Sequence, residues 1–124
     1  DLWVTVGNVD YRKLSDEVER SERTHTIKAR VKAAREIQEE RFKDSKRKIK
    51  TNSEMNVKDL SSMVKLSKEV RDLLDDSAEH LALSARAYHR VIKIARTIAD
   101  LENSAEVEAN HILEALQYRP KVSS

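Results

Sequence analysis

The sequence has 124 residues, of which 37% are charged and 39% hydrophobic, and a net charge of +2. A chain of this length forms one domain with a modest core. The absence of cysteine excludes disulfides and thiolate chemistry, and no apolar run approaches the ~20 residues that span a membrane. One Gly and one Pro among abundant Ala, Leu, Glu, Lys and Arg predict an all-α protein with short connections.

The first 24 residues are predicted to be an extended segment followed by a linker. Leu2 to Val6 alternates and is β-branched like a strand, and Gly7 with Asn8 would end it. Residues 9–22 are polar and predict a loop, anchored by Tyr11 and Leu14. One strand cannot form a sheet, and the sequence starts DLWVTV without Met. We therefore expect a piece of a longer protein, whose preceding part pairs with this strand.

The rest of the sequence, residues 25–119 with a tail at 120–124, is predicted to form a small bundle of four or five helices. Apolar residues recur at helical spacing in each of them. The expected helices are 26–41, 57–64, a helix capped by Ser67 that runs to Leu81, a helix from Ser84 to about Asn103, and 108–118. The only long loop expected, residues 43–54, separates the first two.

The helix that begins at Ser84 carries basic residues where a helix normally prefers acidic ones. At about 100° per residue, Arg86, Arg90, Lys93 and Thr97 fall on one narrow face. A helix N-terminus carries a partial positive charge, so the first arginines are in an unfavourable field. A bound anion would relieve this conflict.

A simpler interpretation of the same face is a solvated surface. The two arginines would then pair with Asp100 on their own helix, or with Asp75 and Asp76 on the preceding one. Such surface pairs are common and contribute little to stability. Composition and spacing do not decide between the two interpretations.

Four stretches carry a resemblance to a known family. The segments LSARAYHRVIKIARTIADL (83–101), HILEALQYR (111–119), ARVKAAREIQEERF (29–42) and TNSEM (51–55) are similar to the C-terminal domain of the magnesium-chelatase-like AAA+ ATPases, in particular the bacterial ComM/YifB branch. The similarity covers residues 27–119. It implies a helical lid that folds over nucleotide bound to an ATPase core.

The resemblance also implies roles for single residues. The S-A-R pattern places the sensor-2 arginine, which reaches the γ-phosphate of ATP, at Arg86. Arg90 and Lys93 become candidate phosphate or subunit contacts. ATP with Mg²⁺ would be the cofactor of the full-length protein, with none bound by this fragment alone. The fragment has no Walker A or Walker B motif, so no catalytic residue and no metal ligand is expected in it.

The partners implied by the resemblance are the ATPase core, neighbouring subunits of a homo-oligomeric ring that is expected to be hexameric, and DNA. The parent would be a cytoplasmic ComM-like branch-migration helicase of natural transformation, without membrane contact. Lys46, Arg47, Lys48 and Lys50 are candidate DNA contacts, although a solvated loop explains the same charges and no aromatic residue is interleaved with them for stacking. The alternative functions are a nucleotide-independent helical module that binds DNA or protein, and a purely structural bundle.

Glu108 and His111 form one E-x-x-H motif, the spacing used by carboxylate di-metal bundles. Those sites need two such motifs and further glutamates. A surface or helix-capping role is therefore expected for this pair.

Overall fold

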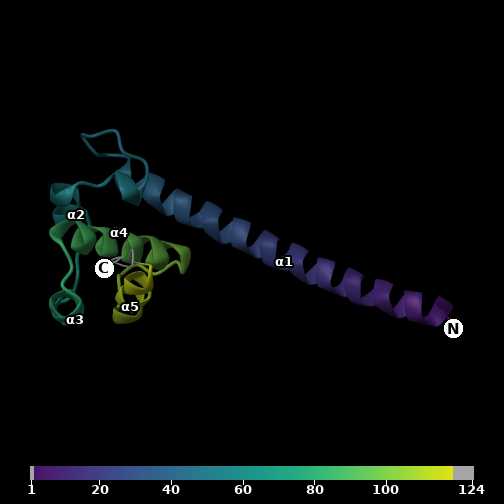
Figure 1. The fold of residues 1–124 in the computed structure, drawn as a ribbon. Helices are drawn as coiled ribbons and strands as arrows, with labels where there is room; N and C mark the ends of the chain where they lie inside the picture. Colours follow the sequence, from purple (N-terminus) through teal and green to yellow (C-terminus); the bar gives the residue numbers. More distant parts are fainter. Residues whose placement is uncertain (1, 119–124) are drawn as a thin grey trace. The chain divides into compact units, whose positions relative to one another are not determined.

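The computed structural model describes the backbone of residues 2–118 and the side chains of residues 13–118. This part of the chain contains five α-helices and one short 3-10 helix, and no strand, so the all-α prediction is confirmed. In chain order they are α1 (Leu2–Phe42), η1 (Asn52–Glu54), α2 (Val57–Met63), α3 (Lys68–His80), α4 (Ala85–Leu101) and α5 (Ala109–Gln117) (Figure 1). The predicted tail 120–124 and the side chain of Tyr11 lie outside the described residues.

The extended N-terminal segment was a wrong prediction, because α1 already begins at Leu2 and continues through the predicted loop. Opposite charges four residues apart, such as Asp16 with Arg20, favour a helix over a loop in this polar stretch. Leu14, predicted as an anchor, is 58% exposed. The chain divides into two compact units, residues 1–32 and 33–124. The proposed boundary to a preceding core at residue 24 stays a prediction.

Helix α4 is the central element of the second unit, and it contacts α5, α2 and η1 (Figure 1). Helix α3 packs on α5. Fully buried side chains from these helices and Met55, which follows η1, form the core, with Leu74, Val91, Ala95 and Ile112 among them. The short helix α2, predicted at 57–64, contributes buried Leu60, and Val64 after its end is buried too.

The ends of α3 and α4 follow local sequence signals. Ser67 accepts a hydrogen bond from the backbone N–H of Val70, and Ser84 accepts one from Ala87 at 3.1 Å. Helix α4 ends at Leu101 with Glu102 as its C-cap, and Asn103 has a positive φ of 57°. Asparagine tolerates this left-handed conformation better than most residues. The chain therefore turns at Asn103, which is close to the helix end that the sequence predicted.

The buried face of α4 includes only part of its apolar residues. Val91 and Ala95 are buried, whereas Ile94 and Ile98 are only half-buried. Arg96 and Asp100 are buried in spite of their charges. The helix is central and has neighbours on more than one side, so its hydrophobic periodicity alone does not identify the face that packs.

Candidate functional site: a basic groove on helix α4

A groove of about 760 Å³ lies in the second unit between α4 and the segment formed by η1 and the start of α2. The α4 side contributes the predicted basic face together with apolar side chains. The lining residues are Ser53, Met55, Asn56, Val57, Leu60, Arg86, His89, Arg90, Lys93, Ile94, Thr97 and Ile98. The structure therefore brings Arg86, Arg90, Lys93 and Thr97 together on one hollow, as the sequence predicted.

Two of these cations have no carboxylate partner. Arg86 and Arg90 are exposed, and neither forms an ion pair or a side-chain hydrogen bond within the described part of the chain. Lys93 is half-buried, and its Nζ donates to the backbone oxygen of Ser53 at 3.3 Å across the groove. Helix α4 has no acidic residue in its first turn, so its dipole adds to the positive field of this end.

The carboxylates proposed as partners in the solvated-surface interpretation do not pair with these arginines. Asp100 is buried and bonds to Arg41 and Arg96 instead. Asp75 accepts a hydrogen bond from the Tyr88 hydroxyl at 2.6 Å, and Asp76 forms no ion pair among the described residues. The positive charge of the groove is thus not neutralised by its expected neighbours.

Tyr88 belongs to the packing between α4 and α3 rather than to the groove, which it does not line. Burial and the hydrogen bond to Asp75 raise the pKa of Tyr88 from 10.0 to about 12. This hydroxyl therefore stays protonated at neutral pH and keeps α4 attached to α3.

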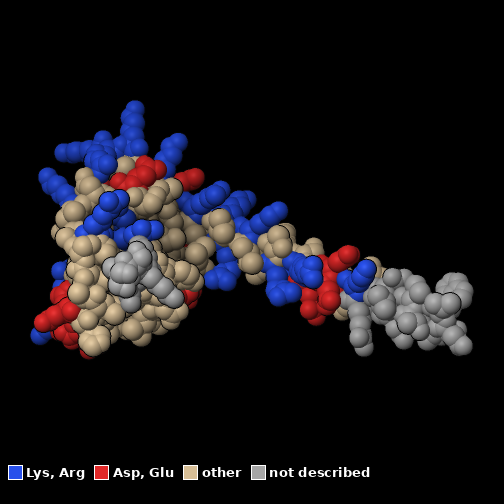
Figure 2. All heavy atoms as spheres, viewed as in Figure 1, with Lys and Arg blue, Asp and Glu red and all other residues tan. Residues whose placement is uncertain are grey.

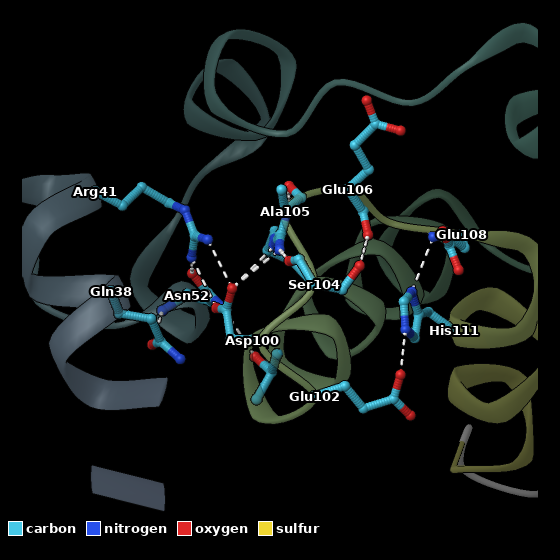
Figure 3. A network of polar contacts seen from close by, with 12 residues as sticks. Gln38, Arg41, Asn52, Asp100, Glu102, Ser104, Ala105, Glu106, Glu108 and His111 are labelled. Atoms are coloured by element: carbon cyan, nitrogen blue, oxygen red, sulfur yellow. Dashed lines mark hydrogen bonds and ion pairs between the residues drawn. The ribbon is translucent and has the colours of Figure 1, made fainter. Parts of the chain in front are cut away.

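A buried polar network behind the groove is the main feature that the sequence did not reveal (Figure 3). Arg41 donates to both oxygens of Asp100, at 2.8 and 2.7 Å, and to Asn52 at 2.8 Å. Arg96 reaches the same carboxylate and the backbone oxygens of Ser104 and Ala105. Burial lowers the pKa of Arg96, and the charge of Asp100 opposes that shift. The only sequence signal was the spacing of Arg96 and Asp100, four residues apart on one helix.

The basic loop after α1 is anchored to the rest of the second unit at two points. Arg47, a candidate DNA contact, forms an ion pair with Asp59 on α2, and Ile49 is buried in the core. Lys46, Lys48 and Lys50 are exposed, and their ammonium groups have no partner among the side chains described. Figure 2 shows Lys and Arg side chains projecting from the surface over this loop.

The E-x-x-H motif caps α5, as expected. The backbone N–H of Glu108 donates to Nδ1 of His111 at 2.9 Å, while Nε2 lies 2.7 Å from a carboxylate oxygen of Glu102. His111 is 1% exposed. Among residues described by the structure, no group of three or more His, Asp or Glu side chains is arranged to hold a metal ion.

Comparisons with known proteins agree with the resemblance. Residues 21–119 match the family described as magnesium chelatase, subunit ChlI C-terminal. The chain is 34% identical to competence protein ComM of Haemophilus influenzae over 122 residues, which are 98% of this chain and 23% of that protein. It is 39% identical to YifB of Escherichia coli over 106 residues, which are 86% of this chain and 20% of that protein.

YifB of Salmonella typhimurium is 36% identical over the same length. No solved structure matches. In the part of the chain that the structure describes, no helix is both long and apolar enough to cross a membrane.

Proposed function

Because the chain belongs to the magnesium chelatase ChlI C-terminal family, we propose that it is the lid of an AAA+ ATPase and that Arg86 is its sensor-2 arginine. The observation that carries this proposal is the groove on α4, where Arg86 and Arg90 face solvent without a carboxylate partner. A triphosphate would supply the missing negative charge. The proposal therefore explains why basic residues occupy the start of a helix.

The basic residues of the groove are suited to a triphosphate. A guanidinium forms charge-assisted, bidentate hydrogen bonds to phosphate oxygens, and the position of Arg86 at the positive end of α4 supports this role. Arg90 and Lys93 would extend the contact to other phosphates or to a neighbouring subunit. Mg²⁺ would arrive with the nucleotide and neutralise charge on the transferred phosphoryl group. Arg86 would then sense the terminal phosphate and couple lid position to hydrolysis.

The chain spans only about one fifth of the length of the curated relatives it matches, so the activity of the whole protein is also a proposal. We propose that the parent forms a homo-oligomeric, hexameric ring in which the lid contacts its own core and the next subunit. Nucleotide bound between subunits would then coordinate the ring. One relative is named competence protein ComM, which agrees with a role in natural transformation. We propose, on the resemblance to that branch of the family, that the parent is a DNA motor acting as a branch-migration helicase in the cytoplasm.

The test is ATP hydrolysis by the longer protein that carries this domain, with and without DNA, comparing Arg86→Ala with the unmodified protein. We expect turnover to fall steeply while assembly is retained. Arg35→Ala is the matched control, because Arg35 is exposed, has no partner among the described residues and does not line the groove. Normal hydrolysis by Arg86→Ala would refute the sensor assignment.

A second candidate function, binding of a DNA backbone without nucleotide, is supported by the basic loop. Anchoring by Ile49 and by the Arg47 pair leaves Lys46, Lys48 and Lys50 unpaired at the surface. Lysine contacts to phosphates are independent of sequence and sensitive to salt. The corresponding measurement is DNA affinity as a function of salt concentration.

The variant for this test replaces Lys46, Lys48 and Lys50 with alanine. We expect weaker binding and a log–log salt slope shallower by about 0.9 for each phosphate contact removed. A charge-matched control replaces Lys32, Lys65 and Lys68, which are exposed elsewhere on the chain. Equal slopes for both triple variants would exclude the loop as a DNA contact.

A further inference from the structure

The wall of the groove that faces α4 is a short turn with little regular structure of its own. It consists of η1, Asn52–Glu54, and the residues after it, of which Ser53 and Met55 line the groove. A three-residue 3-10 helix has too few hydrogen bonds to hold a fixed position by itself. Its position must therefore be set by contacts with neighbouring elements.

Asn52 supplies those contacts on the side of α1. Its backbone N–H donates to Oε1 of Gln38 at 3.0 Å, and its Oδ1 accepts from Nη1 of Arg41 at 2.8 Å. Both partners lie on the last turns of α1, within the second unit. Asn52 is 1% exposed, so these bonds form away from solvent (Figure 3).

The amide nitrogen of Asn52 makes the contacts on the side of α4. Nδ2 donates to Oδ2 of Asp100 at 2.8 Å and to Oγ1 of Thr97 at 3.1 Å. Arg41 bonds to the same carboxylate, so the guanidinium of Arg41, the carboxylate of Asp100 and the amide of Asn52 are each bonded to the other two. Every polar atom of the Asn52 side chain is thus bonded, which fixes the side chain in one orientation.

The residues next to Asn52, in sequence and by hydrogen bond, line both walls of the groove. Ser53, the next residue, lines the groove and accepts the hydrogen bond from Lys93. Thr97, which bonds to Asn52, lines the opposite wall and donates its own hydroxyl to the backbone oxygen of Lys93. Asn52 itself does not line the groove.

We propose that Asn52 is a positioning residue, which sets the separation of η1 from α4 and so the placement of Ser53 and Lys93 against a bound anion. The nature of that anion, a nucleotide triphosphate, rests on the proposed function, whereas the geometric role of Asn52 does not. A buried polar network is weak evidence for stability, because apolar side chains of the same volume fill such a space equally well. Its distinct physical effect is one fixed geometry between the elements it joins.

The first test measures the groove without any ligand. The chain contains no cysteine, so Glu54→Cys on η1 and Ala85→Cys at the start of α4 accept spin labels at two defined points. Both residues are exposed, and neither lines the groove. Electron–electron dipolar spectroscopy then reports the distribution of distances between the two walls.

Asn52→Asp is the test variant. It keeps the shape of the side chain but turns the donor toward Asp100 into an acceptor. We expect a broader or displaced distance distribution. Asn52→Ser, which introduces no charge and has a shorter side chain, is the test variant if Asn52→Asp does not fold.

The control is Leu74→Ala, which opens a cavity in the core at a residue that does not line the groove. Each variant is compared at a temperature at which circular dichroism shows it folded. We expect Leu74→Ala to lose stability while its distribution of distances stays unchanged. An unchanged distribution for both Asn52 variants would overturn the proposal.

The second test measures binding of Mg²⁺-ATP and of Mg²⁺-tripolyphosphate to the longer protein that carries this domain by equilibrium titration, because the chain alone is expected to bind no nucleotide. In metal sites, removing a supporting hydrogen bond weakens affinity by about tenfold or more, and we expect a similar loss for the folded Asn52 variant. Equal affinity of that variant and the unmodified longer protein would overturn the positioning role. Absence of binding by the unmodified longer protein would refute the proposed function instead, and the distance measurement would still decide the role of Asn52.

Discussion

Asp100 is the residue whose replacement tests the energetics of this fold most directly. Its carboxylate is fully buried and accepts hydrogen bonds from the guanidinium groups of Arg41 and Arg96 and from the amide of Asn52. The side chains of Arg41 and Arg96 are 15% and 8% exposed, so solvent replaces little of what the carboxylate provides. One negative charge thus pairs with two nearly buried positive charges.

Asp100→Asn keeps the shape of the side chain but removes that charge. Breaking a buried ion pair on one side costs about 3–5 kcal/mol, because the remaining charge is left without compensation. A domain of this size has a total stability of about 5–15 kcal/mol, so the loss is a large share of it. At 4 °C or more per kcal/mol, even the lower figure lowers the melting temperature by about 12 °C.

The assay is urea unfolding followed by circular dichroism, with thermal melts as a second measure. Asp76→Asn is the matched control, since Asp76 is exposed on α3 and has no partner among the described side chains. The control should change stability by less than about 0.5 kcal/mol. A loss below about 1 kcal/mol for Asp100→Asn would mean that the two arginines find other partners or solvent, and would refute the reasoning.

Three further results are expected. The hydrogen bond from Tyr88 to Asp75 should stabilise the fold fully below pH 10 and lose its effect as the pH rises toward the raised pKa of about 12. The difference in phenolate absorbance between the unmodified chain and Tyr88→Phe should follow that pKa, and ionisation near pH 10 would contradict it. His111→Ala should cost about 1–3 kcal/mol in urea unfolding, because the cap of α5 is lost, whereas Asn110→Ala beside it should be neutral. Arg86→Gln should raise stability by roughly a few tenths of a kcal/mol, because a charge opposed to the helix dipole is removed. A clear loss would instead reveal a stabilising contact of Arg86.

The features that were correctly predicted depend on residues close together in the sequence. Ser67 and Ser84 mark the starts of α3 and α4 because an N-cap acts within three residues. The grouping of Arg86 and Arg90 on one face follows from helix periodicity alone. The all-α class follows from composition, since almost no Gly or Pro interrupts the chain.

The features that were missed depend on competition between strand and helix, or on contacts between residues far apart in the sequence. Residues 2–6 have the β-branched alternation of a strand, but no partner strand exists among the described residues and the helix continues through them. Arg41 and Asp100 are 59 residues apart, and no local pattern indicates that they meet. For the same reason the burial of Asn52, which joins them, could not be read from the sequence.

The arginines of α4 have different surroundings along the helix. Arg96 lies one turn from Asp100 and shares it with Arg41, so its charge is paired inside the fold. Arg86 is 14 residues from Asp100, a separation of about 21 Å along a helix with a rise of 1.5 Å per residue, so it cannot reach the same carboxylate. Nothing in the described part of the chain replaces that partner. The charge at the start of α4 thus forms no ion pair within the described residues, and this supports the proposal that its partner is an anion from outside.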